Sequence, residues 1–257
     1  MCHVGLWPMV RAAKMYVMQQ MTPHHADPFD YDRFMAVVDL SQTEICRELY
    51  RANTEMIRIK KEHVAVRNLA RVIEATLRLS NRKGFAAMSL RELCQEAGLS
   101  MGGLYAVIHR KEDLVGLIQS HGFMLTRRIL AAFTTGVADP LARLDAAVTS
   151  HLFLSEAMRP WFYFSYMEAR HLPAAHRRDA VGIEQETEDL FHDIIDDGIA
   201  AGRFAPVDAR LTASMTKAML QDWYLKRGKY RAQNTGVAQY ADGLRGLLHA
   251  HLGIGAG

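Results

Sequence analysis

Residues 72–114 constrain the fold more than any other part of the chain, because helix caps and glycines there mark out three short helices. The first helix ends at Gly84, after a basic last turn. Ser89 and Glu92 form a Ser-x-x-Glu capping box that begins a second helix, and Gly98 ends that helix within a four-residue turn. A turn this short sets two helices roughly across one another, which predicts a helix-turn-helix.

The third helix of this group, residues 101–108, is the candidate recognition helix. Gly102 and Gly103 each cost a helix about 1 kcal/mol relative to Ala, so a close approach to a phosphate chain explains them better than helix stability does. Tyr105 carries a hydroxyl for a phosphate, and Lys111 begins the next helix, where its ammonium and the helix amides favour an anion. The pattern predicts DNA contacts at Ser89, Ser100, Met101, Gly102, Gly103, Tyr105, His109 and Lys111.

The other residues of this run complete one pattern. Its positions are Val72, Ile73, Ala75, Thr76, Gly84, Phe85, Ser89, Arg91, Glu92, Ala97, Gly98, Leu99, Ser100, Gly102, Leu104, Tyr105, Lys111, Glu112 and Leu114. With these residues the chain resembles the DNA-binding domain of the TetR/AcrR family of transcriptional regulators. Its departures from the family pattern are Ser80, Met88, Met101, Gly103 and Ile108. Because Met101, Gly103 and Ala106 offer base edges no hydrogen bonds, we expect DNA shape and phosphate contacts to carry more of the affinity.

The resemblance implies an all-α protein, with an N-terminal helix-turn-helix DNA-binding domain and a C-terminal helical ligand-binding and dimerisation domain. We assign residues 64–114 to the first domain and residues 115–257 to the second. Breaks at 139–140, 159–160, 172–173, 202–206 and 233–236 predict five to six helices beyond Leu114.

The N-terminal part precedes the region of resemblance. Residues 1–40 mix Pro, His, Asp and aromatic residues without periodicity, so we expect a weakly ordered extension. In residues 41–63 apolar side chains recur at alternating steps of four and three, which predicts an extra amphipathic helix. That helix would cap the domain, pair with a second subunit, or bring Arg58, Lys60 and Lys61 to DNA; the sequence leaves all three open.

The charge distribution and the cysteine content limit the partners and the cellular compartment that we expect. The net charge is +3, and residues 47–118 hold 13 Lys and Arg against 8 Asp and Glu, so the basic excess coincides with the helix-turn-helix. Cys2, Cys46 and Cys94 are too few and scattered for a disulfide framework, and no CxxC pair indicates zinc. We expect a cytoplasmic protein with no cofactor, no secretory signal and no membrane partner.

Two apolar stripes near the end of the chain lie at helical spacing. In the TetR family the last two helices pair with their symmetry mates, so the resemblance implies a homodimer on a palindromic operator. The predicted dimerisation residues are Leu211, Met215, Met219, Tyr240, Leu244 and Leu247.

An aromatic run at residues 161–167 is the strongest candidate for an effector site. Plain core packing explains any single ring equally well, but the family's C-terminal domains bind small molecules, and several aromatic faces fit an apolar or amphipathic effector. The predicted ligand-binding residues are Phe123, His151, Trp161, Phe164, Met167, Glu168, His171 and Trp223.

Together these patterns predict a ligand-responsive transcriptional regulator, acting as a repressor and not as an enzyme. One alternative is a helical metal-binding enzyme or ligand carrier that has lost DNA binding, because the pairs Glu168/His171 and Asp189/His192 have the spacing of di-iron helices. Glu184, Glu188, His192 and Asp196 also form a row, although its many charged neighbours favour a solvated face. A protein that coats DNA without sequence preference is the third reading.

Overall fold

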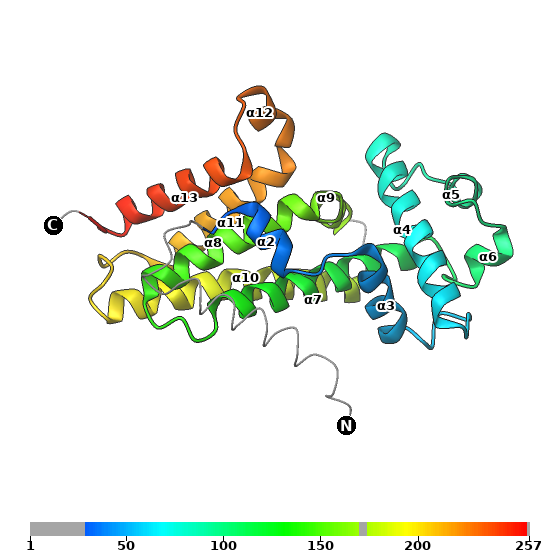
Figure 1. Ribbon diagram of the computed structural model, residues 1–257, viewed down its shortest axis with the longest axis horizontal. Helices are drawn as coiled ribbons and strands as arrows, with labels where there is room; N and C mark the ends of the chain where they lie inside the picture. Colours follow the sequence, from blue (N-terminus) through cyan, green and yellow to red (C-terminus); the bar gives the residue numbers. More distant parts are fainter. Residues whose placement is uncertain (1–28, 170–173, 256–257) are drawn as a thin grey trace. The chain divides into compact units, whose positions relative to one another are not determined.

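The computed structural model describes residues 29–169 and 174–255, with side chains from residue 184 onward in the second range. All the regular elements in these ranges are helices, which confirms the predicted all-α class. The chain forms two compact units (Figure 1). Of the described residues, 39–124, 158–169 and 174–182 form the helix-turn-helix (HTH) unit, while 29–38, 125–157 and 183–255 form the bundle unit.

The helices follow in chain order. They are α2 (Tyr31–Val37), α3 (Gln42–Ala52), α4 (Glu62–Lys83), α5 (Leu90–Ala97), α6 (Met101–Tyr105), α7 (Asp113–Thr134), α8 (Pro140–Ala157), α9 (Arg159–Glu168), α10 (Ala174–Ala200), α11 (Ala209–Leu225), α12 (Arg227–Ala232) and α13 (Val237–His251). No helix of the described residues combines the length and apolar character that crossing a bilayer requires.

The HTH unit is built around α4, which α3, α5, α6 and α9 all contact (Figure 1). One face of α4 is buried over its whole length, from Ala65 to Leu79. The helix ends at Gly84, whose φ of 83° is the left-handed region that glycine enters without strain. An apolar stripe and a glycine exit therefore give this unit its central helix.

The bundle unit is built around α8, which α2, α11 and α13 contact. Every residue from 147 to 155 is buried, and a helix that is buried on all sides must lie at the centre of its unit. Tertiary packing of α8 thus supplies the core of the bundle.

Helix α2 corrects the prediction that residues 1–40 are a weakly ordered extension. Asp30 caps α2 by accepting a hydrogen bond from the Arg33 amide at 2.9 Å, and Phe34 is fully buried. The Phe34 ring lies 5.7 Å from those of Phe133 and Phe153, between centroids. These aromatic residues show no periodicity in the sequence, and contacts with residues distant in sequence order them. Residues 1–28 lie outside the described part.

Helix α3 is shorter than the helix expected at residues 41–63. Asn53 donates from its side-chain amide to the Leu49 carbonyl at 2.8 Å, which satisfies a carbonyl at the helix end. After a turn, Ile57 lies in the core with 1% of its surface exposed, so the apolar stripe expected over residues 41–63 does not extend beyond α3.

The C-terminal region also differs from the expected layout. The expected boundary after residue 114 falls inside α7, and α9 belongs to the HTH unit. Between residues 113 and 251 the described helices number seven, against five to six expected, because α11 and α12 are divided at Lys226 without Pro or Gly. The breaks expected at 139–140, 202–206 and 233–236 are confirmed. The break expected at 159–160 falls one residue earlier, at Met158, with Pro160 in the first turn of α9, and 172–173 lies outside the described residues.

Candidate nucleic-acid interface

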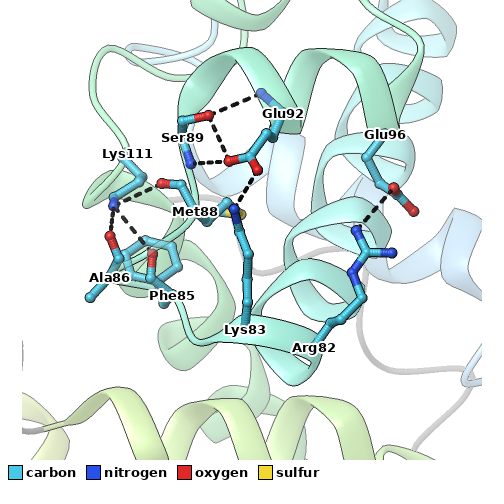
Figure 2. Close-up of polar contacts among 9 residues, drawn as sticks. All are labelled: Arg82, Lys83, Phe85, Ala86, Met88, Ser89, Glu92, Glu96 and Lys111. Carbon is cyan, nitrogen blue, oxygen red and sulfur yellow. Dashed lines mark hydrogen bonds and ion pairs between the residues drawn. The ribbon is translucent and has the colours of Figure 1, made fainter.

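The predicted capping box at the start of α5 is confirmed (Figure 2). The Glu92 amide donates to Ser89 Oγ at 3.2 Å, and the Ser89 amide donates to a Glu92 carboxylate oxygen at 2.9 Å. Lys83 also bonds to this carboxylate, and the Lys83 and Ser89 bonds together lower the pKa of Glu92 to about 2. Ser89 therefore has a local structural task beside its predicted contact with DNA.

The turn between α5 and α6 is fixed from two sides. Gly98 has φ 60° and ψ 39°, the left-handed conformation expected from the sequence. The guanidinium of Arg71, on α4, donates to the Gly98 carbonyl at 2.7 Å. Ser100 Oγ accepts from the Gly103 amide at 3.1 Å and so caps α6.

Helix α6 presents one side outward and anchors the other. Leu104 is fully buried, whereas Met101 is 41% exposed and Tyr105 40% exposed. A Cβ added at Gly102 would meet no atom closer than Ser100 Oγ at 4.0 Å, so this backbone faces open space. The outward side can therefore be approached closely by a backbone of another molecule, while Leu104 holds the helix in place.

Lys111 is placed differently from its predicted role. Its ammonium donates to the carbonyl oxygens of Phe85 at 3.2 Å, Ala86 at 3.1 Å and Met88 at 3.0 Å (Figure 2). An ammonium has three N–H donors, so this arrangement leaves none for a phosphate. Neighbouring His109 is exposed, and its backbone amide is held by Asp113 at 2.9 Å.

The predicted ligand residues on α9 lie in the HTH unit. Trp161, Phe164 and Glu168 are buried, at 8%, 3% and 8% exposure, while Met167 is 36% exposed. The Phe164 ring meets Phe85 edge-on at 5.6 Å between centroids. Phe123 is half-buried in the same unit, and His171 lies outside the described residues.

The other two predicted ligand residues, His151 and Trp223, lie in the core of the bundle unit, both fully buried. The Trp223 indole N–H donates to Glu156 at 3.0 Å, and the Arg227 guanidinium lies over the indole at 4.5 Å. Burial, and then the charge of Lys217, hold the pKa of His151 well below its usual value. The predicted set is thus divided between the two units.

Lys217, on α11, is a functional candidate that the sequence analysis missed. Burial lowers the pKa of its ammonium to about 8, although the charges of Glu184 and Glu188 act in the opposite direction. A single Lys within a mixed helix carries no sequence signal of burial, because most such lysines face water.

Three of the predicted dimerisation residues form an exposed apolar set on α11 and α13. Leu211, Met215 and Leu247 are 57%, 54% and 63% exposed. Leu244 instead lies in the core with 4% exposure, and Tyr240 donates its hydroxyl to the Met219 carbonyl at 2.7 Å. The apolar residues predicted as one stripe on α13 therefore belong to two faces of the helix, one buried and one exposed.

The alternative prediction from the sequence was a helical metal-binding protein. In the part of the chain that the structure describes, no group of three or more His, Cys, Asp or Glu side chains is arranged to hold a metal ion. In the predicted row, Glu184 accepts a bond from Gln221 and Glu188 one from Ser214.

The cap of α5, the left-handed turn and the outward side of α6 together define a helix-turn-helix domain. Family models agree. The model described as bacterial regulatory proteins, tetR family, matches residues 72–118, and that of the tetracyclin repressor-like C-terminal domain matches residues 137–247. Together they cover more than half of the chain, which belongs to the TetR family of transcriptional regulators.

Individual relatives are distant but similar over most of their length. The chain is 26% identical over 204 residues to the HTH-type transcriptional regulator YfiR of Bacillus subtilis, covering 72% of this chain and 92% of YfiR. AibR, solved with isovaleryl coenzyme A and operator DNA, is 24% identical with a TM-score of 0.63, covering 70% and 97% of the two chains. FadR of Bacillus subtilis, solved with stearoyl-CoA, is 17% identical with a TM-score of 0.58, covering 70% and 97%. AibR and FadR thus share the fold of this chain.

Proposed function

We propose that this protein is a homodimeric repressor that binds a palindromic operator through α6 and leaves it when a mostly apolar effector binds. The observation that carries the proposal is that α6 has one side buried in the core and one side exposed. Its Leu104 is locked in the core while Met101, Gly102 and Tyr105 face outward on a rigid cap and turn. Such a helix is available to enter a major groove.

Each outward residue of α6 suits a particular DNA contact. Gly102 permits a close phosphate backbone, and the Tyr105 hydroxyl donates to a phosphate oxygen. Met101 offers its side chain to a thymine methyl group. His109 is exposed beyond the end of the helix, whereas Ser89, Ser100 and Gly103 serve the caps; Lys111 is not among the DNA contacts that we propose.

Dimerisation is supported by the apolar side chains that the bundle unit leaves exposed. Leu211, Met215 and Leu247 are each more than half exposed on the two helices that this family pairs with a second subunit. Exposed apolar side chains on two helices that contact each other favour a partner surface. Two copies would then present two α6 helices about 34 Å apart, one turn of DNA.

An acyl thioester or a related amphipathic acid is the effector class that we propose. AibR and FadR were solved with acyl-coenzyme A molecules, and both share this fold. Within the bundle unit, the half-buried Lys217 offers a cation near His151 on the apolar α8, so a cation and apolar surface, the two features that such an amphipath requires, occur together there. A coupling free energy of about 1–3 kcal/mol between effector and DNA suffices for regulation. The buried thiols of Cys46 and Cys94 accord with a cytoplasmic location.

Fluorescence anisotropy with DNA from upstream of the protein's own gene tests the proposal. We expect a salt-sensitive affinity at least about 10³-fold above that for scrambled DNA, and release on addition of acyl-coenzyme A of suitable chain length. Equal affinity for scrambled DNA would support the coating protein instead. Selective binding that no acyl-coenzyme A reverses would remove the proposed effector class.

A further inference from the structure

A short basic segment lies against the recognition helix and outside the region that the family model matches. This basic connector, residues 57–61, joins α3 to α4. The Arg58 amide donates to the carbonyl of Ala106, the residue that caps the end of α6, at 2.9 Å. The Arg58 guanidinium lies 3.4 Å from the His109 ring nitrogen Nδ1. The connector therefore shares one surface with α6 inside the HTH unit.

The basic connector is held in a fixed conformation. Ile57 is 1% exposed and secures its start, while the Tyr50 hydroxyl donates to the Lys60 carbonyl at 3.3 Å near its end. Lys61 directly precedes the first turn of α4 and makes no side-chain cap bond. Backbone contacts fix the connector, so its charged side chains are not required for the fold.

Three cations of the basic connector are exposed: Arg58, Lys60 and Lys61. Among the described residues none of them forms an ion pair. The nearest acid in sequence, Glu62, is already paired with Arg47 at 3.3 Å and Arg51 at 3.2 Å. Unneutralised cations on a rigid segment beside a DNA-reading helix have one obvious complement, a line of phosphates.

We propose that the basic connector is a second DNA-contacting element, in which Arg58, Lys60 and Lys61 bind backbone phosphates next to the groove that α6 occupies. The proposal rests on the proposed function. It also provides an electrostatic contribution where the recognition helix lacks one, because α6 itself carries no cation and Lys111 is bonded to three carbonyls. Phosphate contacts position a protein without reading sequence, so the connector adds affinity and not specificity.

The test compares three proteins on the operator duplex: wild type, the triple variant Arg58→Gln/Lys60→Gln/Lys61→Gln, and Arg231→Gln as a matched control. Arg231 is an exposed cation on α12 in the bundle unit. Affinity is measured by anisotropy over a range of salt concentrations. The slope of log K against log salt should become shallower by about 0.9 for each lost phosphate contact, and affinity at low salt should fall at least about tenfold for the triple variant. The control should match wild type.

One further variant and a set of thermal melts separate the effect of charge from an effect on folding. A charge-conserving triple, Arg58→Lys/Lys60→Arg/Lys61→Arg, should bind as wild type does, and thermal melts of all variants should coincide because the altered side chains are exposed. The loss in the Gln triple should be equal on operators whose flanking bases are exchanged, since phosphates are the same in every sequence.

The outcomes distinguish this inference from the function on which it depends. Wild type that fails to select an operator would overturn the proposed function itself. Wild type that selects its operator while the Gln triple keeps the same affinity and salt slope would overturn the connector alone. A loss that changes with the flanking bases would also overturn the phosphate assignment.

Discussion

The ammonium of Lys111 lies 3.0 Å from the carbonyl oxygen of Met88 and forms an internal fastening of the HTH unit. Two further carbonyls, of Phe85 and Ala86, accept its other N–H bonds, and the ammonium lies 5.0 Å from the centroid of the Phe85 ring. Together these contacts fix the loop between α4 and α5 to the segment between α6 and α7. A residue placed by sequence among the DNA contacts is thus a structural cation.

Lys111→Met should therefore destabilise the protein. We expect a loss of about 2 kcal/mol in the free energy of unfolding, because three carbonyls lose a charged donor. Urea denaturation measures it. Lys83→Met is the informative comparison, since Lys83 bonds to the Glu92 carboxylate at the surface and its loss should cost less. Unchanged stability of Lys111→Met with weakened DNA binding would restore the phosphate contact.

Gly102→Ala should separate folding from DNA binding. A Cβ at this position meets open space, so the variant should gain up to about 1 kcal/mol of helix stability. If a phosphate backbone approaches Gly102, the same methyl group should weaken operator binding. Thermal melts and anisotropy measure the two effects.

The matched control for that variant is Gly228→Ala on α12 in the bundle unit, where an added Cβ also meets nothing within 4 Å. It should gain stability and leave DNA affinity unchanged. Operator binding by Gly102→Ala at wild-type strength would show that no close backbone approach occurs there.

Local sequence signals predicted the helix-turn-helix well, because the interactions behind them join residues that are close in sequence. The box of Ser89 and Glu92, the glycine exit at Gly84 and the left-handed Gly98 each depend on residues within a few positions. Their geometry is settled by the backbone near them, and a sequence therefore displays it directly.

Features that depend on distant contacts were not predictable in this way. Helix α2 forms because Phe34 packs against Phe153, more than a hundred positions away. Lys111 looked exposed for the same reason, since its carbonyl partners come from a separate loop.

Leu247→Glu should shift the proposed homodimer toward monomers. Leu247 is 63% exposed on α13, and a carboxylate placed in an apolar contact between subunits would be desolvated without a partner. Sedimentation at several protein concentrations measures the dissociation constant, which should rise at least about tenfold. Operator affinity should fall with it, because two linked heads are needed.

A control on the same helix is Ala238→Glu, which is also exposed but lies on the opposite side of α13 from Leu247 by helical spacing. It should leave the dimer intact. A Leu247→Glu protein that sediments as the wild type does would exclude this face from the interface.

Lys217 should make the stability of the protein rise between pH 8 and pH 10. Its pKa is lowered to about 8 in the folded chain from 10.5, so across this range the unfolded chain holds a proton that the folded chain has released. Stability rises with pH wherever the unfolded state binds more protons, here by up to about 1.4 kcal/mol per pH unit.

Urea denaturation from pH 7.5 to 9.5 measures the slope. Lys217→Met should be more stable than wild type at pH 7.5 and should lose this rise. Lys226→Met should keep it, because Lys217 is still present. Parallel profiles for wild type and Lys217→Met would mean that the ammonium is solvated in the folded protein and that Glu184 and Glu188 offset its burial.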